Sequence, residues 1–219
     1  MDANFTIYHT CHLENSINST FENSPYKCSP DVPQWLGDGY YFWTDSDFFA
    51  HKWGKRPDKY PKGYVITQYS VNLPQNSFLD LVGNVKDQLL FKEQIKKYLE
   101  RMGEELSREN ARAIPISKVL DHLRLAKGGC RDYFKYDAIK AMDCSSIETF
   151  SYKFTEEESQ KELIPIPTRQ QLFLRNLSFL KSKQLVCIKR LENDFSGRKK
   201  VYINKSFNKE EYIVEYKGN

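Results

Sequence analysis

The stretch Gly37-Asp38-Gly39-Tyr40-Tyr41-Phe42-Trp43 decides how this chain folds. Its two glycines and its aspartate are typical of a tight turn, because glycine adopts backbone conformations that other residues avoid. The four consecutive aromatic residues that follow are bulky enough to form a buried strand. Residues 46–53 then place their apolar positions at helical spacing, with Ser46 or Asp47 as the N-cap. The sequence therefore predicts a turn, a strand and a helix in succession.

Strand-like segments rich in β-branched and aromatic residues flank this unit. Phe5–His9 is typical of a short strand, and a loop with one short helix is expected after it, as far as Pro33. Gly63–Leu81 contains two strand-like pieces divided by Pro74, which lacks the N–H that a central strand needs. Further strands are expected at 136–139, 148–154, 171–174 and 185–188, and a hairpin is expected between 200–203 and 212–216.

Two helices are expected between these strands. Apolar residues recur at helical spacing over 86–106, with Lys and Glu on the other face, and a second helix is expected over 117–126, ended by Gly128-Gly129. This helical insert at about 86–126 is either part of the core or a lid or docking surface for a substrate or an inhibitory partner. Many strands with one inserted helical pair predict an α+β domain.

The composition favours one compact domain with an appendage. The chain has 219 residues, of which 40% are apolar, 28% charged and 14% aromatic, enough to build a sizeable core and a pocket lined by rings. No apolar run reaches the roughly 18 to 20 residues of a membrane helix, and the first residues lack the basic and then apolar pattern of a secretion signal. The expectation is a soluble, cytoplasmic protein with no membrane partner.

The spacing of the cysteines and the distribution of charge limit the kinds of site that the chain is expected to hold. The five cysteines are widely spaced, include no C-x-x-C pair and accompany no histidine cluster, so neither a metal site nor a disulfide framework is expected. The net charge is +4, and the segment from Lys181 to the end holds ten Lys/Arg against five Asp/Glu. This basic tail, in which aromatic residues are interleaved, is either a solvated tail or a surface for nucleic acid.

Four short segments match the motifs of one family. Tyr8-His9-Thr10-Cys11 is similar to a Y-H-G-[ST] strand start, Gly37–Phe42 to a G-x-G-x-Y-F strand, and Ala50–Trp53 to an A-x-x-W element. Gln171 stands at the head of a late strand. In order and spacing, these segments resemble the ADP-ribosyltransferases, the group that includes diphtheria-type toxins and poly-ADP-ribose polymerases. The A-x-x-W element is similar to that of uncharacterised bacterial relatives.

This resemblance implies a fold, a domain organisation and a co-substrate. The fold is the split β-sandwich of the family, expected over residues 1–190 with the helical insert at about 86–126. Residues 191–219 are expected to form a basic hairpin extension. The co-substrate is NAD, whose bond between nicotinamide and ribose the family breaks.

The resemblance also implies roles for individual residues. His9 would hydrogen-bond a ribose hydroxyl, and the backbone of Thr10 would hold the nicotinamide carboxamide. Tyr41 and Trp53 would stack on the nicotinamide ring, with Gly39 making the turn that aims Tyr41 inward. Such a site must also stabilise an oxocarbenium-like sugar, because breaking the bond develops positive charge on the ribose.

Two residues depart from the family pattern. Thr10 replaces a glycine and adds a side chain where the carboxamide approaches. Gln171 completes the catalytic set with His9 and Tyr41, but it replaces a glutamate. A neutral amide cannot place a full negative charge beside the developing cation, and losing one such interaction costs about 3 kcal/mol. Poly-ADP-ribose synthesis is therefore not expected. The acidic residues that can stand in are Glu148 and Glu156-Glu157-Glu158.

The expected function is that of an NAD-dependent mono-ADP-ribosyltransferase acting on a macromolecular acceptor, either protein or nucleic acid. The resemblance implies an intracellular bacterial toxin or defence effector, and a toxin of this kind implies a neutralising, antitoxin-type partner protein. Two alternatives use the same pocket. One is a binding module of the same fold without catalysis, and the other is an NAD glycohydrolase that transfers ADP-ribose to water.

Overall fold

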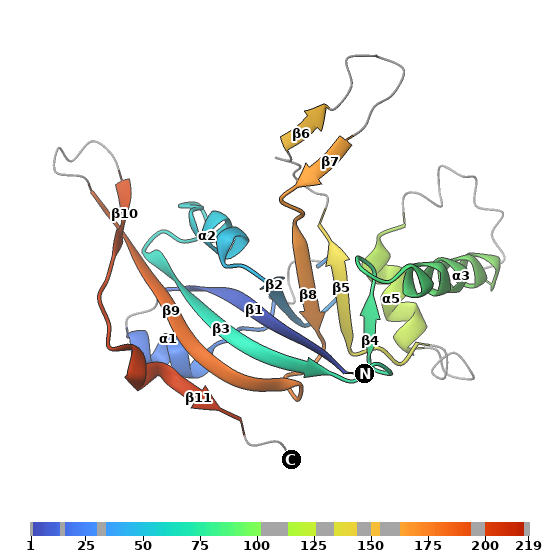
Figure 1. The fold of residues 1–219 in the computed structure, drawn as a ribbon, viewed down its shortest axis with the longest axis horizontal. Coiled ribbons are helices and arrows are strands. Elements are labelled where there is room, and N and C mark those ends of the chain that lie inside the picture. Colours follow the sequence, from blue (N-terminus) through green and yellow to red (C-terminus); the bar gives the residue numbers. More distant parts are fainter. Residues whose placement is uncertain are drawn as a thin grey trace.

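The computed structural model describes residues 2–13, 16–29, 34–101, 114–125, 134–143, 150–153, 163–193 and 200–216. Within these ranges, the chain is organised around a nine-stranded, mostly antiparallel sheet (Figure 1). The strand order is β10-β9-β3-β1-β2-β8-β5-β4, and β11 also pairs with β9. Helices pack against this sheet, and the predicted α+β class is confirmed.

The elements follow the predicted order closely. The strands of the large sheet are β1 (Ala3–His12), β2 (Tyr40–Thr44), β3 (Gly63–Leu73), β4 (Phe78–Asp80), β5 (Ala138–Met142), β8 (Gln170–Leu174), β9 (Leu180–Asn193), β10 (Lys200–Asn204) and β11 (Ile213–Glu215). A separate antiparallel pair is formed by β6 (Phe150–Lys153) and β7 (Leu163–Ile166). The helices are α1 (Ile17–Asn23), α2 (Phe48–Gly54), α3 (Val85–Arg101), α5 (Ile116–Leu125) and the short 3-10 helix η1 (Lys209–Tyr212). The two helices of the predicted insert are thus α3 and α5, whereas β7 has no counterpart among the predicted strands.

The strand β1 joins the two halves of the sheet, but it pairs unequally with its two neighbours. It shares ten register positions with β3 and only two with β2, namely Ile7 opposite Thr44 and Tyr8 opposite Trp43. Directly after β2, Asp45 has a left-handed φ of 66°, which ends the strand. The sheet consequently divides at this junction into a β9-β3-β1 half and a β2-β8-β5-β4 half (Figure 1).

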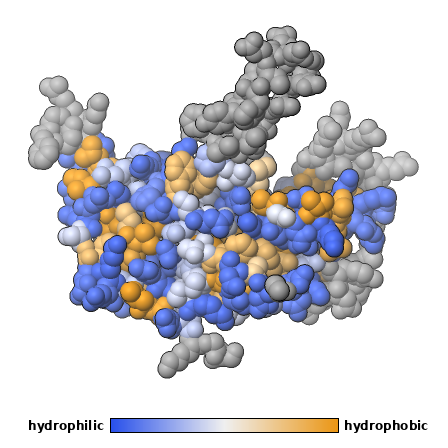
Figure 2. Space-filling view, viewed as in Figure 1, coloured by the Kyte–Doolittle hydropathy of each residue, from blue (hydrophilic) through white to orange (hydrophobic). Residues whose placement is uncertain are grey.

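The helices cover separate apolar clusters, and a further cluster around Ile7, Phe42, Tyr69 and Leu172 draws residues from both halves of the sheet. On one half, α3 and α5 pack beside β5 and β8 and bury Phe91, Tyr98, Val119, Leu120, Leu123, Ile139 and Phe173. On the other half, Trp43, Ala50, Tyr60, Tyr64 and Ile66 form a core beneath α2. The helical insert therefore contributes to the core. Figure 2 shows one face of the molecule, on which hydrophilic residues surround smaller apolar groups. Of the helices described, none combines the length and the apolar character that crossing a bilayer requires.

The C-terminal strands correct one prediction. The expected hairpin between 200–203 and 212–216 is wrong, because β10 and β11 both pair antiparallel with β9, opposite residues 189–193 and 182–184. Two strands that are both antiparallel to β9 run in the same direction and cannot form a hairpin together. They are instead two parts of one interrupted strand, separated by η1. The hairpin of this region is formed by β9 and β10, and β9 runs through the domain boundary expected at residue 190.

A buried lysine fixes α1 to the sheet. Lys183 on β9 is 3% exposed, and its Nζ donates to the backbone carbonyls of Phe21, Glu22 (3.3 Å) and Ser24 (2.6 Å) at the end of α1. Its amine also lies 4.4 Å from the centroid of the Phe21 ring. Burial lowers the pKa of Lys183 to about 8. Tyr69 adds to this anchor, because its hydroxyl donates to the Ser24 Oγ (3.1 Å). The loop that follows α1 is thereby held in place.

Gly39 is enclosed where this loop meets β8. Its N–H donates to the Sγ of Cys28 (3.3 Å), and its carbonyl accepts from the Cys28 N–H (3.0 Å). A Cβ at this position would lie 2.4 Å from the ring of Phe173 and 2.6 Å from the carbonyl oxygen of Leu174. The absence of a side chain is therefore what lets the turn approach β8.

The substitution Gly39→Ala is expected to lower the free energy of unfolding by about 1 to 3 kcal/mol, because the added methyl group overpacks against a ring and a backbone oxygen. Urea denaturation of the wild type and the variant measures the change. The control is Gly83→Ala, at an exposed turn where the nearest atom is a carboxylate oxygen of Asp80, 2.9 Å away at the end of a side chain. Equal effects of the two substitutions would contradict the packing role of Gly39.

Candidate functional site

The strands β2 and β8 bring three of the predicted residues to one face of the sheet. Trp43 lies opposite Gln171, and Tyr41 lies opposite Phe173. Directly opposed residues of an antiparallel pair share a face, so Tyr41, Trp43 and Gln171 point to the same side. The ring of Trp53 on α2 lies 6.1 Å from that of Trp43. The structure thus brings Tyr41, Trp53 and Gln171 together, and it adds Trp43 to them.

Gln171 is oriented by a tryptophan that sequence reasoning missed. The indole Nε1–H of Trp35 donates to the Oε1 of Gln171 at 3.0 Å, and Gln171 is 8% exposed. Because an indole nitrogen only donates, the amide oxygen must be the atom that faces Trp35. The amide NH₂ is then the group that Gln171 can offer to a ligand. In the sequence, the signal for Trp35 was its position two residues before the turn at Gly37.

The turn that carries Trp35 is braced by the hydroxyl of Tyr41. This hydroxyl accepts from the Leu36 N–H (3.0 Å) and donates to the Gly37 carbonyl (2.8 Å). From α5, the Nη1 of Arg124 donates to the Leu36 carbonyl at 3.3 Å. Burial raises the pKa of Tyr41 far above its usual value, so the hydroxyl stays protonated at neutral pH. The helical insert therefore helps to place Trp35 on Gln171.

A partly buried ion pair lies on the same face. The Nη2 of Arg169 is 2.9 Å from the Oδ2 of Asp143, and the two side chains are 17% and 12% exposed. Ala141 lies opposite Gln171, so Asp143 and Arg169 follow two residues along from that pair. The guanidinium of Arg169 lies 5.1 Å from the ring centroid of Trp43. Asp143 is thus a carboxylate beside Gln171 that the sequence did not indicate. The predicted stand-ins, Glu148 and Glu156-Glu157-Glu158, lie outside the described residues.

His9 lies apart from this face. Its ring packs near that of Phe42, with 5.6 Å between ring centroids, and Phe42 belongs to the core on the other side of β2. The Tyr26 N–H donates to its Nε2 (3.2 Å), so its Nδ1 carries the proton and donates to the Tyr41 carbonyl (2.9 Å). Although part of the residue's surface stays accessible, these backbone groups enclose the ring nitrogens, and burial lowers the pKa of His9 to about 4. The structure does not bring an imidazole nitrogen to Gln171.

Thr10 and the cysteines have structural surroundings. The hydroxyl of Thr10 donates to the Ala50 carbonyl at 2.9 Å, so this side chain holds α2 to β1. Cys11, Cys28 and Cys187 are in the reduced form, and Cys130 and Cys144 lie outside the described residues. Within the described part of the chain, no group of three or more His, Cys, Asp or Glu side chains is placed to hold a metal ion.

Comparison with known proteins returned no relative: no protein-family model, curated protein or solved structure matches this chain. The functional proposal therefore rests on the chemistry of the residues described above.

The substitution Trp35→Phe is expected to cost about 1 to 3 kcal/mol of unfolding free energy, because it leaves the buried Oε1 of Gln171 without its donor. A double-mutant cycle with Gln171→Met isolates this bond. We expect a coupling free energy of about 1 kcal/mol, measured by urea denaturation of the two single variants and the double variant. Strictly additive effects would show that the two side chains do not interact.

The wild type is expected to lose stability between pH 6.5 and pH 4 relative to the His9→Gln variant. The pKa of His9 is lowered in the folded protein, so in this window the unfolded state binds a proton that the folded state does not, and stability falls as the pH falls. The expected loss at pH 4.5 is about 2 to 3 kcal/mol. Urea denaturation of both proteins at pH 7 and pH 4.5 measures it. A constant difference between them would refute a buried, neutral His9.

Proposed function

We propose that this chain is an NAD-dependent mono-ADP-ribosyltransferase with the split β-sandwich fold of that family, acting on a macromolecular acceptor. The observation that carries the proposal is the face on which Gln171 and Trp43 oppose each other, with Tyr41 and Trp53 beside them. Tyr41, Trp53 and Gln171 come from the segments that resemble the family, and they meet next to the junction where β1 and β2 separate. The wide spacing of these segments in the sequence makes their meeting informative.

The chemistry of this face suits the transfer of ADP-ribose. In the proposed step, the bond between the nicotinamide nitrogen and the ribose C1′ breaks, and its electron pair leaves with nicotinamide. A nucleophilic atom of the acceptor forms the new bond to C1′ and loses its proton to solvent. Tyr41 and one face of Trp53 supply flat apolar surfaces for the nicotinamide ring, whereas the ring of Trp43 is buried in the core beside Trp53. The NH₂ of Gln171 supplies a donor for an oxygen of the ribose.

The site stabilises a developing positive charge on the ribose less than it would with a free carboxylate. Gln171 is neutral, and the carboxylate of Asp143 is paired with Arg169. Stabilisation of a developing positive charge therefore depends on dipoles and on the enclosure of the site. His9 has both ring nitrogens bonded to backbone groups, so in this proposal it positions Tyr41 through the carbonyl of that residue.

A binding module without catalysis is the second candidate. The observation that favours it is the hydrogen bond between Trp35 and Gln171, which already uses the amide oxygen that a ribose hydroxyl would need. Such a module would bind NAD without releasing nicotinamide. An NAD glycohydrolase would instead release both nicotinamide and free ADP-ribose in the absence of any acceptor.

The proposed biological role is that of an intracellular bacterial toxin or defence effector. A transferase that consumes NAD in the cytoplasm harms the cell that contains it. The proposal therefore includes an antitoxin-type protein that neutralises the chain.

Incubation with labelled NAD and cell lysate tests the proposal, with nicotinamide release and label transfer as the two readouts. The wild type is expected to show both, and Tyr41→Ala and Gln171→Ala are each expected to lower them about 100-fold or more. Gln171→Glu is expected to raise the rate, because a carboxylate can accept from Trp35 and also stabilise the developing cation.

The control for this experiment is Lys200→Ala, an exposed position on β10. It is expected to leave both rates unchanged. NAD binding in a calorimeter without nicotinamide release by the wild type or by Gln171→Glu would reject the transferase and support the binding module. Nicotinamide release with free ADP-ribose as the sole product would assign the chain as a glycohydrolase.

A further inference from the structure

The end of α2 and the turn after it form a basic surface that the site residues do not account for. Residues 52–62 contain five cations and a single acid, Asp58. The cations are Lys52, Lys55, Arg56, Lys59 and Lys62. We call these five residues the α2 basic surface. The four lysines are exposed and Arg56 is partly exposed. Asp58 pairs with Arg56 at 3.1 Å and is the single acid among residues 52–62, so the segment as a whole has a net positive charge.

Trp53 connects this surface to the Gln171 face. The guanidinium of Arg56 lies 4.9 Å and the amine of Lys59 4.4 Å from the centroid of the Trp53 ring. The guanidinium of Arg169, which belongs to the Gln171 face, lies 5.7 Å from the same ring. Trp53 is only partly buried. A partly exposed indole ring thus stands between the cations of the α2 basic surface and the proposed site.

The positive potential extends along α2 toward β9. Burial lowers the pKa of His51, and the charges of Lys189 and Lys55 lower it further, against the opposing effect of Asp47. Lys189 is on β9, so the basic tail adds to the field at α2 through this residue. Other cations of the tail are already engaged: Lys183 is buried beneath α1, and Lys205 lies 3.6 Å from Glu192. Lys181, Arg190, Lys200 and Lys209 of the tail are exposed as well, but the cations at α2 are the ones that lie against the partly exposed ring of Trp53.

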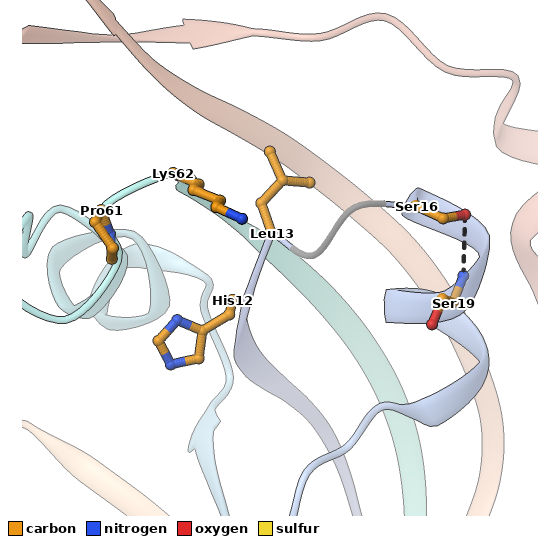
Figure 3. Close-up of a pocket in the computed structure, with 7 residues that line it drawn as sticks. His12, Leu13, Ser16, Ser19, Pro61 and Lys62 are labelled. Carbon is orange, nitrogen blue, oxygen red and sulfur yellow. Dashed lines mark hydrogen bonds between the residues drawn. The ribbon is translucent and has the colours of Figure 1, made fainter.

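A pocket of about 600 Å³ adjoins the α2 basic surface at Lys62 (Figure 3). Its lining residues are His12, Leu13, Ser16, Ser19, Pro61, Lys62 and Gly63. Lys62 belongs both to the pocket and to the α2 basic surface. Among the described residues, the lining offers an amine, an imidazole and two hydroxyl groups and includes no carboxylate. These groups suit a phosphate or a sugar better than a cation.

We propose that the α2 basic surface binds single-stranded nucleic acid, with one end of the strand at the Lys62 pocket and the other at Trp53. Phosphates would lie on Lys55, Lys59 and Lys62, and a base would stack on Trp53. Single strands are favoured over duplexes, because a paired base has no free face to offer to a ring. The aromatic ring among the cations favours nucleic acid over an acidic protein, which would need charge alone.

The role of this strand as the acceptor rests on the proposed function, whereas its binding does not. Trp53 touches both the α2 basic surface and the face that holds Gln171 and Arg169. A nucleotide that stacks on Trp53 therefore stands next to the place where the ribose C1′ would be attacked. A nitrogen of that base is the proposed nucleophile, which forms the bond to C1′ and loses one proton.

Binding is tested without NAD, by fluorescence anisotropy with labelled 12-nucleotide single strands of RNA and DNA. We expect the logarithm of the association constant to fall with the logarithm of salt concentration with a slope of about −2 to −3.5, for three to five phosphate contacts. Lys55→Ala with Lys59→Ala is expected to make this slope shallower by about 1.4. Trp53→Ala is expected to weaken binding about 5- to 150-fold, while Trp53→Phe retains most of the affinity.

The matched control removes two cations from the tail, in the double variant Lys200→Ala with Lys205→Ala. It is expected to bind single strands as the wild type does. An equal loss in the tail variant and in the α2 variant would overturn the assignment to α2. Equal affinity for a duplex, or for polyglutamate with no effect of Trp53→Ala, would overturn the assignment to single-stranded nucleic acid. The melting temperature of each variant separates loss of binding from loss of folding.

The two proposals fail separately in these experiments. Single-strand binding that depends on Trp53, without nicotinamide release, would retain the nucleic-acid surface and reject the transferase. Nicotinamide release and labelled protein, without binding of either oligonucleotide, would retain the transferase and reject the nucleic-acid surface.

Discussion

The His9 imidazole holds together the point at which the sheet divides. β1 and β2 share only two register positions, and the bond from the His9 Nδ1 to the Tyr41 carbonyl adds a further tie between them. The other ring nitrogen accepts from Tyr26, in the loop that Lys183 and Tyr69 secure behind α1. One neutral ring therefore connects both halves of the sheet with the loop after α1. Protonation of His9 would break this arrangement, because an imidazolium cannot accept a hydrogen bond from the Tyr26 N–H.

Contacts to both the backbone and the side chain of Tyr41 hold this residue in place, and they also hold the residues around Gln171. Its backbone is held by His9, and its hydroxyl is held by the turn at Leu36 and Gly37. The same turn carries Trp35, whose indole orients Gln171. A binding site whose side chains are already oriented loses little conformational entropy when a ligand arrives. The helical insert takes part through Arg124, so the core of one half of the sheet and the site on its surface are mechanically connected.

Local patterns predicted much of this structure, and the errors came from contacts between distant segments. The aromatic run 40–43 and the helical spacing after it gave β2 and α2, and the resemblance placed Tyr41, Trp53 and Gln171, which do meet. Asp143 and Arg169 were missed because the register of β5 against β8 brings them together, and no short segment contains both. Strand alternation, which turns His9 away from Tyr8 and Thr10, would have warned that His9 and Gln171 lie on different sides. The predicted hairpin between 200–203 and 212–216 was wrong because the two segments are as suited by sequence to pair with β9 as with each other.

The interruption between β10 and β11 has a consequence for how this chain meets other chains. The edge of a sheet presents a row of unpaired backbone groups that can recruit a strand from another molecule. This edge also carries apolar side chains, with Ile213 52% and Val214 39% exposed. Because η1 divides it into segments of five and three residues, it offers two short templates in place of one long one. A break in a strand thus protects the protein against edge-to-edge aggregation.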